Sequence, residues 1–170
     1  MKKIIIALIL CLGLVACSSE KKEEAKETKE EQTTQENEPE VSQNIIVKTD
    51  FFQIELPQNW EGKYQEDIIE AEDGAYSLCL SEKESRKAID GGHLMSIGLY
   101  INEEEYIDLP SYEYIGKLVG DKTYNVVIVY PTDVQFDDSS ADNYRELVKD
   151  LDDIIKTING INGYTFEKEN

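Results

Sequence analysis

The sequence predicts an α+β domain in which one long C-terminal helix covers an antiparallel sheet of about six strands. Apolar residues alternate with polar ones in several short segments between residues 51 and 130, as expected for strands that bury one face. One later segment, 144–158, instead repeats its apolar residues every three or four positions, which is the period of a helix with one buried face. Because short turns separate the strand segments, neighbouring strands are expected to run antiparallel.

The first expected strand covers residues 51–56, where apolar residues alternate with polar ones before Pro57 ends the pattern. Further strands are expected at 63–71, 75–81, 93–102, 112–119 and 124–130. The last of these is apolar on both faces, so we expect it at the centre of the sheet with cover on both sides. The C-terminal helix covers one side, and the loop around Trp60 or a short helix at 82–90 is expected to cover the other.

The C-terminal helix is predicted from a single apolar stripe. The stripe consists of Tyr144, Leu147, Val148, Leu151, Ile154, Ile155 and Ile158. The residues between these positions are polar, so the opposite face is expected to meet water. Ser139 and Asp142 fit a capping box at the start, and Gly160 is expected to end the helix.

The opening of the domain resembles a known fold family. The pattern Phe52-x-Ile54-x-Leu56-Pro57-x-x-Trp60 is similar to the first strand of Mog1/PsbP-like domains. The strand exit at 130–133 and the amphipathic terminal helix also resemble small lipoproteins of gut Firmicutes associated with that fold. The resemblance implies an α/β/α sandwich on an antiparallel sheet, a role in binding partner proteins, and no shared catalytic residues.

The N-terminus has the layout of a secretory signal, with two lysines followed by an uncharged run over residues 4–16. The run is shorter than the roughly 20 residues of a membrane-spanning helix. Its end, Leu14-Val15-Ala16-Cys17, resembles the lipobox of bacterial lipoproteins. The resemblance implies that residues 1–16 are a signal peptide, that Cys17 is lipidated, and that the protein is anchored to the extracytoplasmic face of the cell membrane. The alternative is an ordinary signal peptide in which Cys17 has no role.

Residues 17–44 are expected to form a disordered acidic tether, because they hold nine glutamates, four lysines and almost no apolar residues. Residues 45–170 are expected to form a single globular domain. This domain has 27 acidic and 11 basic residues, a net charge of −16. Such a surface repels nucleic acid and is compatible with cationic partners.

The sequence offers no catalytic signature, so no enzyme activity, metal or cofactor is expected. His93 is the only histidine, and strand alternation places it on the face opposite Cys79, which argues against a nucleophile–base pair. Cys79 is the only cysteine of the domain and is expected to be a buried structural residue. The acidic loop of Asp133, Asp137, Asp138 and Asp142 lacks the spacing of an EF-hand. Whether this loop binds cations is left open.

Tyrosines supply the candidate interaction site. Tyr106, Tyr112 and Tyr114 surround a Leu-Pro-Ser turn, and exposed tyrosines suit protein recognition. Core packing is the alternative role for these side chains. The expected function is a non-enzymatic protein-binding or accessory module that is held to the membrane through lipid on Cys17. A solute-binding component of a transporter and, with less support, a hydrolase are the alternatives.

Overall fold

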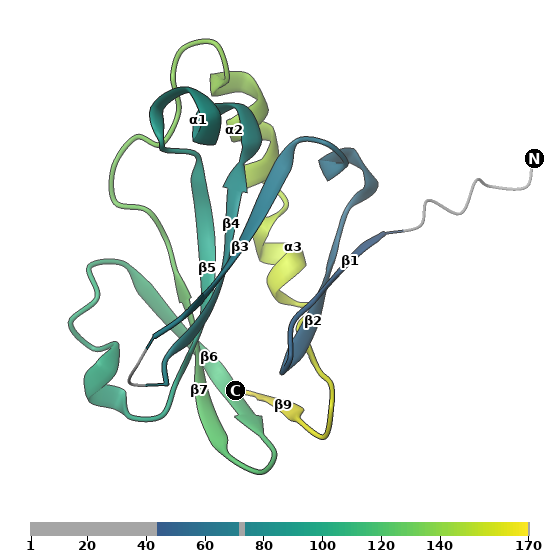
Figure 1. Cartoon of the computed structure of the whole chain (residues 1–170), viewed down its shortest axis with the longest axis vertical. Coiled ribbons are helices and arrows are strands. Elements are labelled where there is room, and N and C mark those ends of the chain that lie inside the picture. Colours follow the sequence, from purple (N-terminus) through teal and green to yellow (C-terminus); the bar gives the residue numbers. More distant parts are fainter. Residues whose placement is uncertain (1–43, 72–73, 170) are drawn as a thin grey trace, which may run out of the picture. The chain divides into compact units, whose positions relative to one another are not determined.

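The computed structural model describes residues 44–71 and 74–169, so the predicted signal peptide, Cys17 and the tether before residue 44 lie outside the described residues. Two antiparallel sheets make up the fold (Figure 1). The smaller sheet has the order β1–β2–β8, and the larger has the order β3–β4–β5–β7–β6–β9. Among the described residues, no helix has the length and apolar character needed to cross a membrane.

The elements have the following bounds. The strands are β1 Ile45–Lys48, β2 Phe52–Leu56, β3 Tyr64–Glu70, β4 Tyr76–Glu82, β5 His93–Tyr100, β6 Tyr112–Val119, β7 Thr123–Val129, β8 Asn159–Gly160 and β9 Thr165–Lys168. The α-helices are α1 Lys83–Ile89, α2 Ala141–Val148 and α3 Leu151–Ile155, and short 3₁₀ turns lie at Gln58–Trp60 and Glu103–Glu105.

The predicted fold class, an α/β/α sandwich with a long C-terminal helix, is wrong. The described chain is mostly β, with three short α-helices and two sheets. The segment expected as the first strand of the main sheet, β2, instead pairs with β1 and β8 in the smaller sheet. Three strands were not expected from the sequence: β1, β8 and β9, of which the last forms an edge of the larger sheet beside β6.

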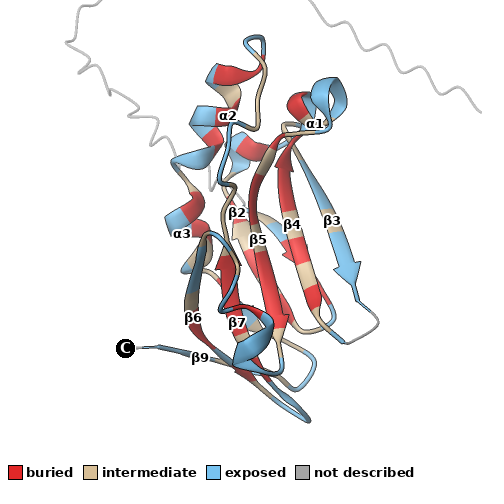
Figure 2. Ribbon diagram, turned by 90° about the vertical axis from the view of Figure 1, so that its left-hand side faces the viewer, coloured by how far each residue is buried: buried red, intermediate tan, exposed pale blue. Residues whose placement is uncertain are grey.

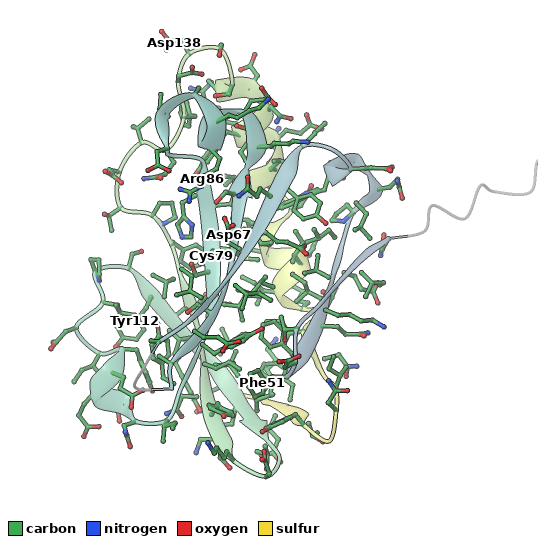
Figure 3. The ribbon with its side chains drawn as sticks, viewed as in Figure 1. Phe51, Asp67, Cys79, Arg86, Tyr112 and Asp138 are labelled. Carbon is green, nitrogen blue, oxygen red and sulfur yellow. The ribbon has the colours of Figure 1, made fainter. Side chains whose placement is uncertain are left out.

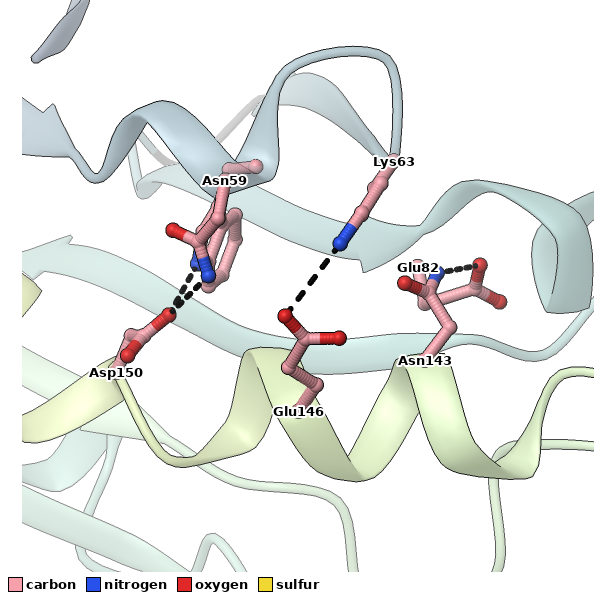
Figure 4. A network of polar contacts seen from close by, with 7 residues as sticks. Asn59, Lys63, Glu82, Asn143, Glu146 and Asp150 are labelled. Atoms are coloured by element: carbon pink, nitrogen blue, oxygen red, sulfur yellow. Dashed lines mark hydrogen bonds and ion pairs between the residues drawn. The ribbon is translucent and has the colours of Figure 1, made fainter.

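The expected C-terminal helix is interrupted after Val148, and a turn at Lys149 and Asp150 separates α2 from α3. The Asp150 N–H donates to Leu147 O at 3.1 Å, which tightens the backbone there. The Asp150 carboxylate accepts hydrogen bonds from Trp60 Nε1 at 2.9 Å and Asn59 Nδ2 at 3.3 Å (Figure 4). Contacts with a segment ninety residues earlier in the chain therefore hold the turn in place.

The chain leaves helical geometry after Ile155 and continues into strands instead of stopping at Gly160. Thr157 Oγ1 donates to Ile154 O at 2.6 Å and accepts from the Glu55 N–H at 2.8 Å. The Thr157 side chain thereby joins the end of α3 to β2, and Asn159–Gly160 then pairs with that strand. Gly160 lies in β8 and does not end a helix. A Cβ at this position would approach Tyr164 O within 2.4 Å, so the close approach of the two backbone segments requires glycine.

The main core lies between one face of the larger sheet and a layer formed by α2, α3 and the smaller sheet (Figure 2). The apolar stripe keeps its buried face across the helix break. Its buried members are Tyr144, Leu147, Leu151, Ile154 and Ile158. Trp60 also belongs to this layer, since its indole is fully buried in the main core and bonds to Asp150.

The other face of the larger sheet is covered differently from the prediction. Neither the loop around Trp60 nor α1 covers the central strand β7 on that side, since Trp60 packs with the helices and α1 contacts the end of β4. The last residue of β5, Tyr100, does so instead. The Tyr100 ring lies over Gly98, which is the register partner of the buried Val127 on β7.

A buried carboxylate joins three elements at one end of the sheet. Glu82 ends β4, is fully buried, and accepts hydrogen bonds from the Glu84 and Ser85 N–H groups at 3.1 and 2.6 Å, which caps α1. Its carboxylate also accepts from Asn143 Nδ2 of α2 at 2.7 Å (Figure 4). Burial acts to raise the pKa of Glu82, but the hydrogen bonds from Ser85, Glu84 and Asn143 outweigh it and leave the pKa below its ordinary value.

Candidate functional site

Four tyrosines meet on the face of the larger sheet that α2 and α3 leave open. We call Tyr100, Tyr106, Tyr112 and Tyr114 the tyrosine cluster. The Tyr106 ring is at its centre, with ring centroids 5.6 Å from Tyr100, 5.6 Å from Tyr112 and 6.3 Å from Tyr114. The rings of Tyr106 and Tyr114 are nearly parallel, with 5° between their planes, and Tyr112 meets Tyr106 edge to face.

The sheet and one tight turn place these rings together. Tyr112 and Tyr114 are two residues apart on β6 and point to the same face. The chain after β5 turns back through Glu103–Glu105, where a capping box joins Asn102 and Glu105. The Tyr106 N–H closes this turn by donating to Glu103 O at 3.1 Å, and the side chain of Tyr106 reaches the sheet.

A bulge in β6 keeps the tyrosines on the open face. The register with β7 shifts between Tyr114 and Gly116, so that Ile115 is an extra residue. Ile115 is buried in the main core, whereas Lys117 lies on the same face as Tyr114. Gly116 adopts φ +144°, and a Cβ there would lie 2.2 Å from Glu167 O of β9, so glycine is required at this crossing.

A cavity of about 410 Å³ opens beside the tyrosine cluster. Its lining consists of Glu103, Tyr106, Tyr112, Tyr114, Lys117, Asn125 and Glu169. Of these residues Tyr106 is 6% exposed, whereas Tyr112 is 39% exposed. Burial is the main cause that raises the pKa of Tyr106 and of Tyr114, with Glu103 adding to the first and Glu169 to the second. Both phenols are therefore neutral hydrogen-bonding groups at pH 7.

The structure thus brings together the three predicted tyrosines and adds Tyr100. Tyr106 is buried, as the core-packing alternative expects, whereas Tyr112 is exposed, as an interaction site requires. Sequence reasoning missed Tyr100. Its ring covers Gly98, which lies two positions earlier on the same face of β5. The role of these residues in binding stays a prediction.

A second group of polar side chains lies farther along the same open face. The prediction that His93 and Cys79 point to opposite faces is wrong, because β5 carries one extra residue. Leu80 pairs with Met95 but Ser81 pairs with His93, so the register shifts by one and Leu94 and Met95 are both buried. His93, Ser96 and Cys79 then share one face, and Cys79 is half-buried instead of fully buried. No local sequence feature marks this bulge.

The acidic loop before α2 is engaged in organising its own turn. Asp137 Oδ1 accepts from the Ser139 and Ser140 N–H groups at 3.1 and 3.0 Å and from both hydroxyls at 2.8 Å. These hydrogen bonds, led by Ser140, lower the pKa of Asp137. Asp142 pairs with Arg145 at 3.4 Å, and the expected capping box of Ser139 and Asp142 is replaced by the Asp137 turn. Within residues 44–71 and 74–169, no three His, Cys, Asp or Glu side chains are grouped to hold a metal ion.

A second cavity, of about 460 Å³, lies between α3 and the pair β6 and β9. Its apolar lining comes from Ile115, Ile155 and Phe166, and its charged lining comes from Glu113, Asp152, Lys156 and Lys168. The two acids and two bases balance, so the cavity favours neither an anionic nor a cationic ligand.

Comparison of the chain with protein-family models, with curated proteins and with solved structures found no match.

Proposed function

We propose that this protein is a membrane-anchored extracytoplasmic lipoprotein that binds a partner protein through the tyrosine cluster and catalyses no reaction. The observation that carries the proposal is the open cavity in which a buried ring, Tyr106, supports an exposed one, Tyr112. A tyrosine held in place by its neighbours buries a large area on binding and loses little conformational freedom. Residues of this kind dominate the energy of many protein interfaces.

The negative charge of the domain favours a partner that binds through a basic segment. Residues 45–170 have a net charge of −16, and Glu103 and Glu169 line the cavity beside the phenol rings. A lysine or arginine side chain of the partner would meet both carboxylates and aromatic faces, and each of these attracts a cation. The same charge disfavours nucleic acid as the partner.

The anchor in the proposal comes from the N-terminal sequence. Cys17 follows a lysine-started apolar run and the residues Leu14-Val15-Ala16, as in bacterial lipoproteins. A diacylated cysteine supplies two chains, and stable anchoring needs at least two. A soluble domain held in this way meets its partner at or near the membrane surface.

The binding site can be tested by replacing the exposed ring. Tyr112→Ala should lower recovery of the partner from native membranes about tenfold, since an interface anchor contributes ~1.4 kcal/mol or more. The melting temperature should change little, because Tyr112 is exposed. Val134→Ala, an exposed apolar residue in the loop before α2, is the matched control and should leave recovery unchanged. Equal recovery with both variants would contradict the proposal, and a co-purifying small molecule would favour the solute-binding alternative.

The anchor requires its own test. Cys17→Ala should abolish incorporation of a lipid label and move the protein from the membrane fraction to the soluble fraction or leave it as an unprocessed precursor. Cys79→Ala is the matched control, since it removes a cysteine of the folded domain and should leave labelling intact. Labelling of the Cys17 variant at the level of the parent protein would refute the anchor.

A further inference from the structure

Cys79, Ser96 and His93 form a continuous chain of polar contacts on the open face of the larger sheet. Ser96 Oγ lies 3.2 Å from Cys79 Sγ and 3.3 Å from His93 Nε2. The bulge in β5 creates this chain, because it places His93 and Ser96 on the same face although they are three residues apart. Ser96 is also the direct cross-strand partner of Cys79.

Cys79 and His93 line a cavity of about 240 Å³ at the α1 end of the sheet, where Figure 3 labels Cys79 near Asp67 and Arg86. The cavity is lined by Cys79 and His93 together with Asp67, Ile69, Ser81, Arg86, Asp90, Gly91 and Gln135. Cys79 is half-buried, so its sulfur adjoins space that a small molecule can enter. Neither the tyrosine cluster nor the proposed binding function uses this cavity.

We propose that Cys79 is a reactive thiol that exchanges with small disulfides carrying both a carboxylate and an ammonium group, with Ser96 and His93 moving its proton. In the structure the Ser96 O–H donates to Cys79 Sγ, whereas the direction of the contact between Ser96 Oγ and His93 Nε2 depends on the imidazole tautomer. For the proton transfer the Ser96 hydroxyl turns, so that Oγ accepts from the Cys79 S–H and the O–H donates to His93 Nε2. When the thiol proton passes to Oγ and the hydroxyl proton passes to Nε2, Cys79 becomes a thiolate and His93 an imidazolium. Ser96 then donates to the thiolate, which stabilises it.

The exchange balances without any further reagent. The Cys79 thiolate attacks one sulfur of the small disulfide, forms a new S–S bond and breaks the old one. The released thiolate takes the proton from His93 Nε2 and leaves as a thiol. Cys79 and one half of the disulfide are thereby joined in a mixed disulfide, and the other half is reduced.

The environment of His93 keeps its imidazole in the neutral form, which has a free nitrogen lone pair. Burial is the main cause that lowers the pKa of His93, and the positive charge of Arg86 lowers it further. The imidazole is therefore neutral at pH 7 and has a nitrogen that can accept the proton. Tyr144 of α2 donates its hydroxyl to the His93 carbonyl at 2.6 Å, which holds the backbone of this residue in position.

The charged groups of the cavity indicate the class of disulfide. Arg86 uses Nη1 to pair with Asp90 Oδ1 at 2.9 Å, and its guanidinium has further N–H donors with which to bind a carboxylate. Asp67, the β3 register partner of Cys79, presents a carboxylate that also accepts from Gln65 Nε2 and can bind an ammonium group. A disulfide of amino acids, such as cystine, carries both groups close to its sulfur atoms.

The test measures the rate at which Cys79 of the full chain forms a mixed disulfide with cystine at pH 7, read from the Cys79 peptide by mass spectrometry. An ordinary thiol is only a few per cent ionised at that pH, so the folded chain should react about tenfold or more faster than the same chain unfolded in urea. Ser96→Ala and His93→Gln should each remove most of that acceleration while Cys79 stays in place. A folded chain that reacts no faster than the unfolded one overturns the proposal, and so do unchanged rates in both variants.

Two further measurements keep the outcome decisive. If either variant fails to fold, as judged by its melting curve, the comparison of folded and unfolded parent chain alone decides whether Cys79 is activated. Hydroxyethyl disulfide, which lacks both charges, is the control probe for recognition. The folded chain should prefer cystine to hydroxyethyl disulfide by a larger factor than the unfolded chain does, and Arg86→Gln should remove that preference. Equal preference in the folded and unfolded chains overturns the assigned class of disulfide.

Discussion

Trp60→Ala is expected to lower the free energy of unfolding by about 3–5 kcal/mol, the usual cost of removing a buried aromatic side chain. The indole is fully buried in the main core and packs against Tyr64, with the ring centroids 6.0 Å apart. Its Nε1 also donates to Asp150 at the turn between α2 and α3, so the substitution leaves this carboxylate without that donor. The loss is a large share of the ~5–15 kcal/mol by which domains are stable. Chemical denaturation at pH 7 measures it.

Two companion variants separate packing from hydrogen bonding at Trp60. Trp60→Phe keeps most of the buried ring but removes the N–H, and it should cost about 1–3 kcal/mol. Val148→Ala lies beside the same turn, where Val148 is 40% exposed, and should change stability by no more than about 0.5 kcal/mol. Similar losses for Trp60→Ala and Val148→Ala would contradict the place of the indole in the core.

Glu82→Ala is expected to cost several kcal/mol. The loss of a helix cap costs about 0.5–2 kcal/mol, and each buried donor left without a partner costs about 1–3 kcal/mol. The Glu82 carboxylate accepts hydrogen bonds from the N–H groups of Glu84 and Ser85 and from the amide of Asn143. In Glu82→Ala all three donors lose this acceptor. Glu84→Gln is the control, since the Glu84 side chain is 64% exposed and pairs only with Lys87 in the described contacts.

The contribution of Glu82 should also depend on pH. The pKa of Glu82 in the folded protein lies below its ordinary value, which is about 4.3 in the unfolded chain. A carboxyl group with a lowered pKa adds stability that is complete above the unfolded pKa and is lost as the pH falls through the folded pKa. Glu82→Gln cannot ionise, so its stability deficit relative to the parent protein should shrink as the pH is lowered through this window. A deficit that stays constant from pH 7 to below pH 4 would contradict the ionised state of Glu82.

The sequence was informative wherever structure depends on nearby residues. Alternation over 75–81 located β4, because successive side chains of a strand point to opposite faces whatever the strand pairs with. The continuous apolar run at 124–130 located β7, because a strand covered on both sides is apolar on both faces. The stripe from Tyr144 to Ile158 identified the buried side of α2 and α3 for the same kind of reason, since a helix repeats every 3.6 residues. Tyr112 and Tyr114 could be placed on one face by spacing alone.

The sequence failed wherever a partner distant in the chain decides the outcome. It could not show that β2 would pair with β1 and β8, because an alternating strand fits either sheet. It predicted one long helix where contacts from Asn59 and Trp60 to Asp150 hold a turn, so the fold class was wrong. The short strands β8 and β9 have too few residues for a periodic pattern to appear.

For the candidate sites, too, local sequence and tertiary structure each decided a different part. By itself the sequence determined which residue types are present: tyrosines near 106–114, one histidine and one cysteine in the domain, and an excess of acids. Only the tertiary structure decided which of them meet. The bulges at Ile115 in β6 and near Leu94 in β5 set the faces on which Lys117 and His93 lie, and a bulge depends on how two strands pair across the sheet. A pattern with period two continues through such a position without any sign of it, so the contact of His93 with Ser96, and through it with Cys79, could be seen only in the folded chain.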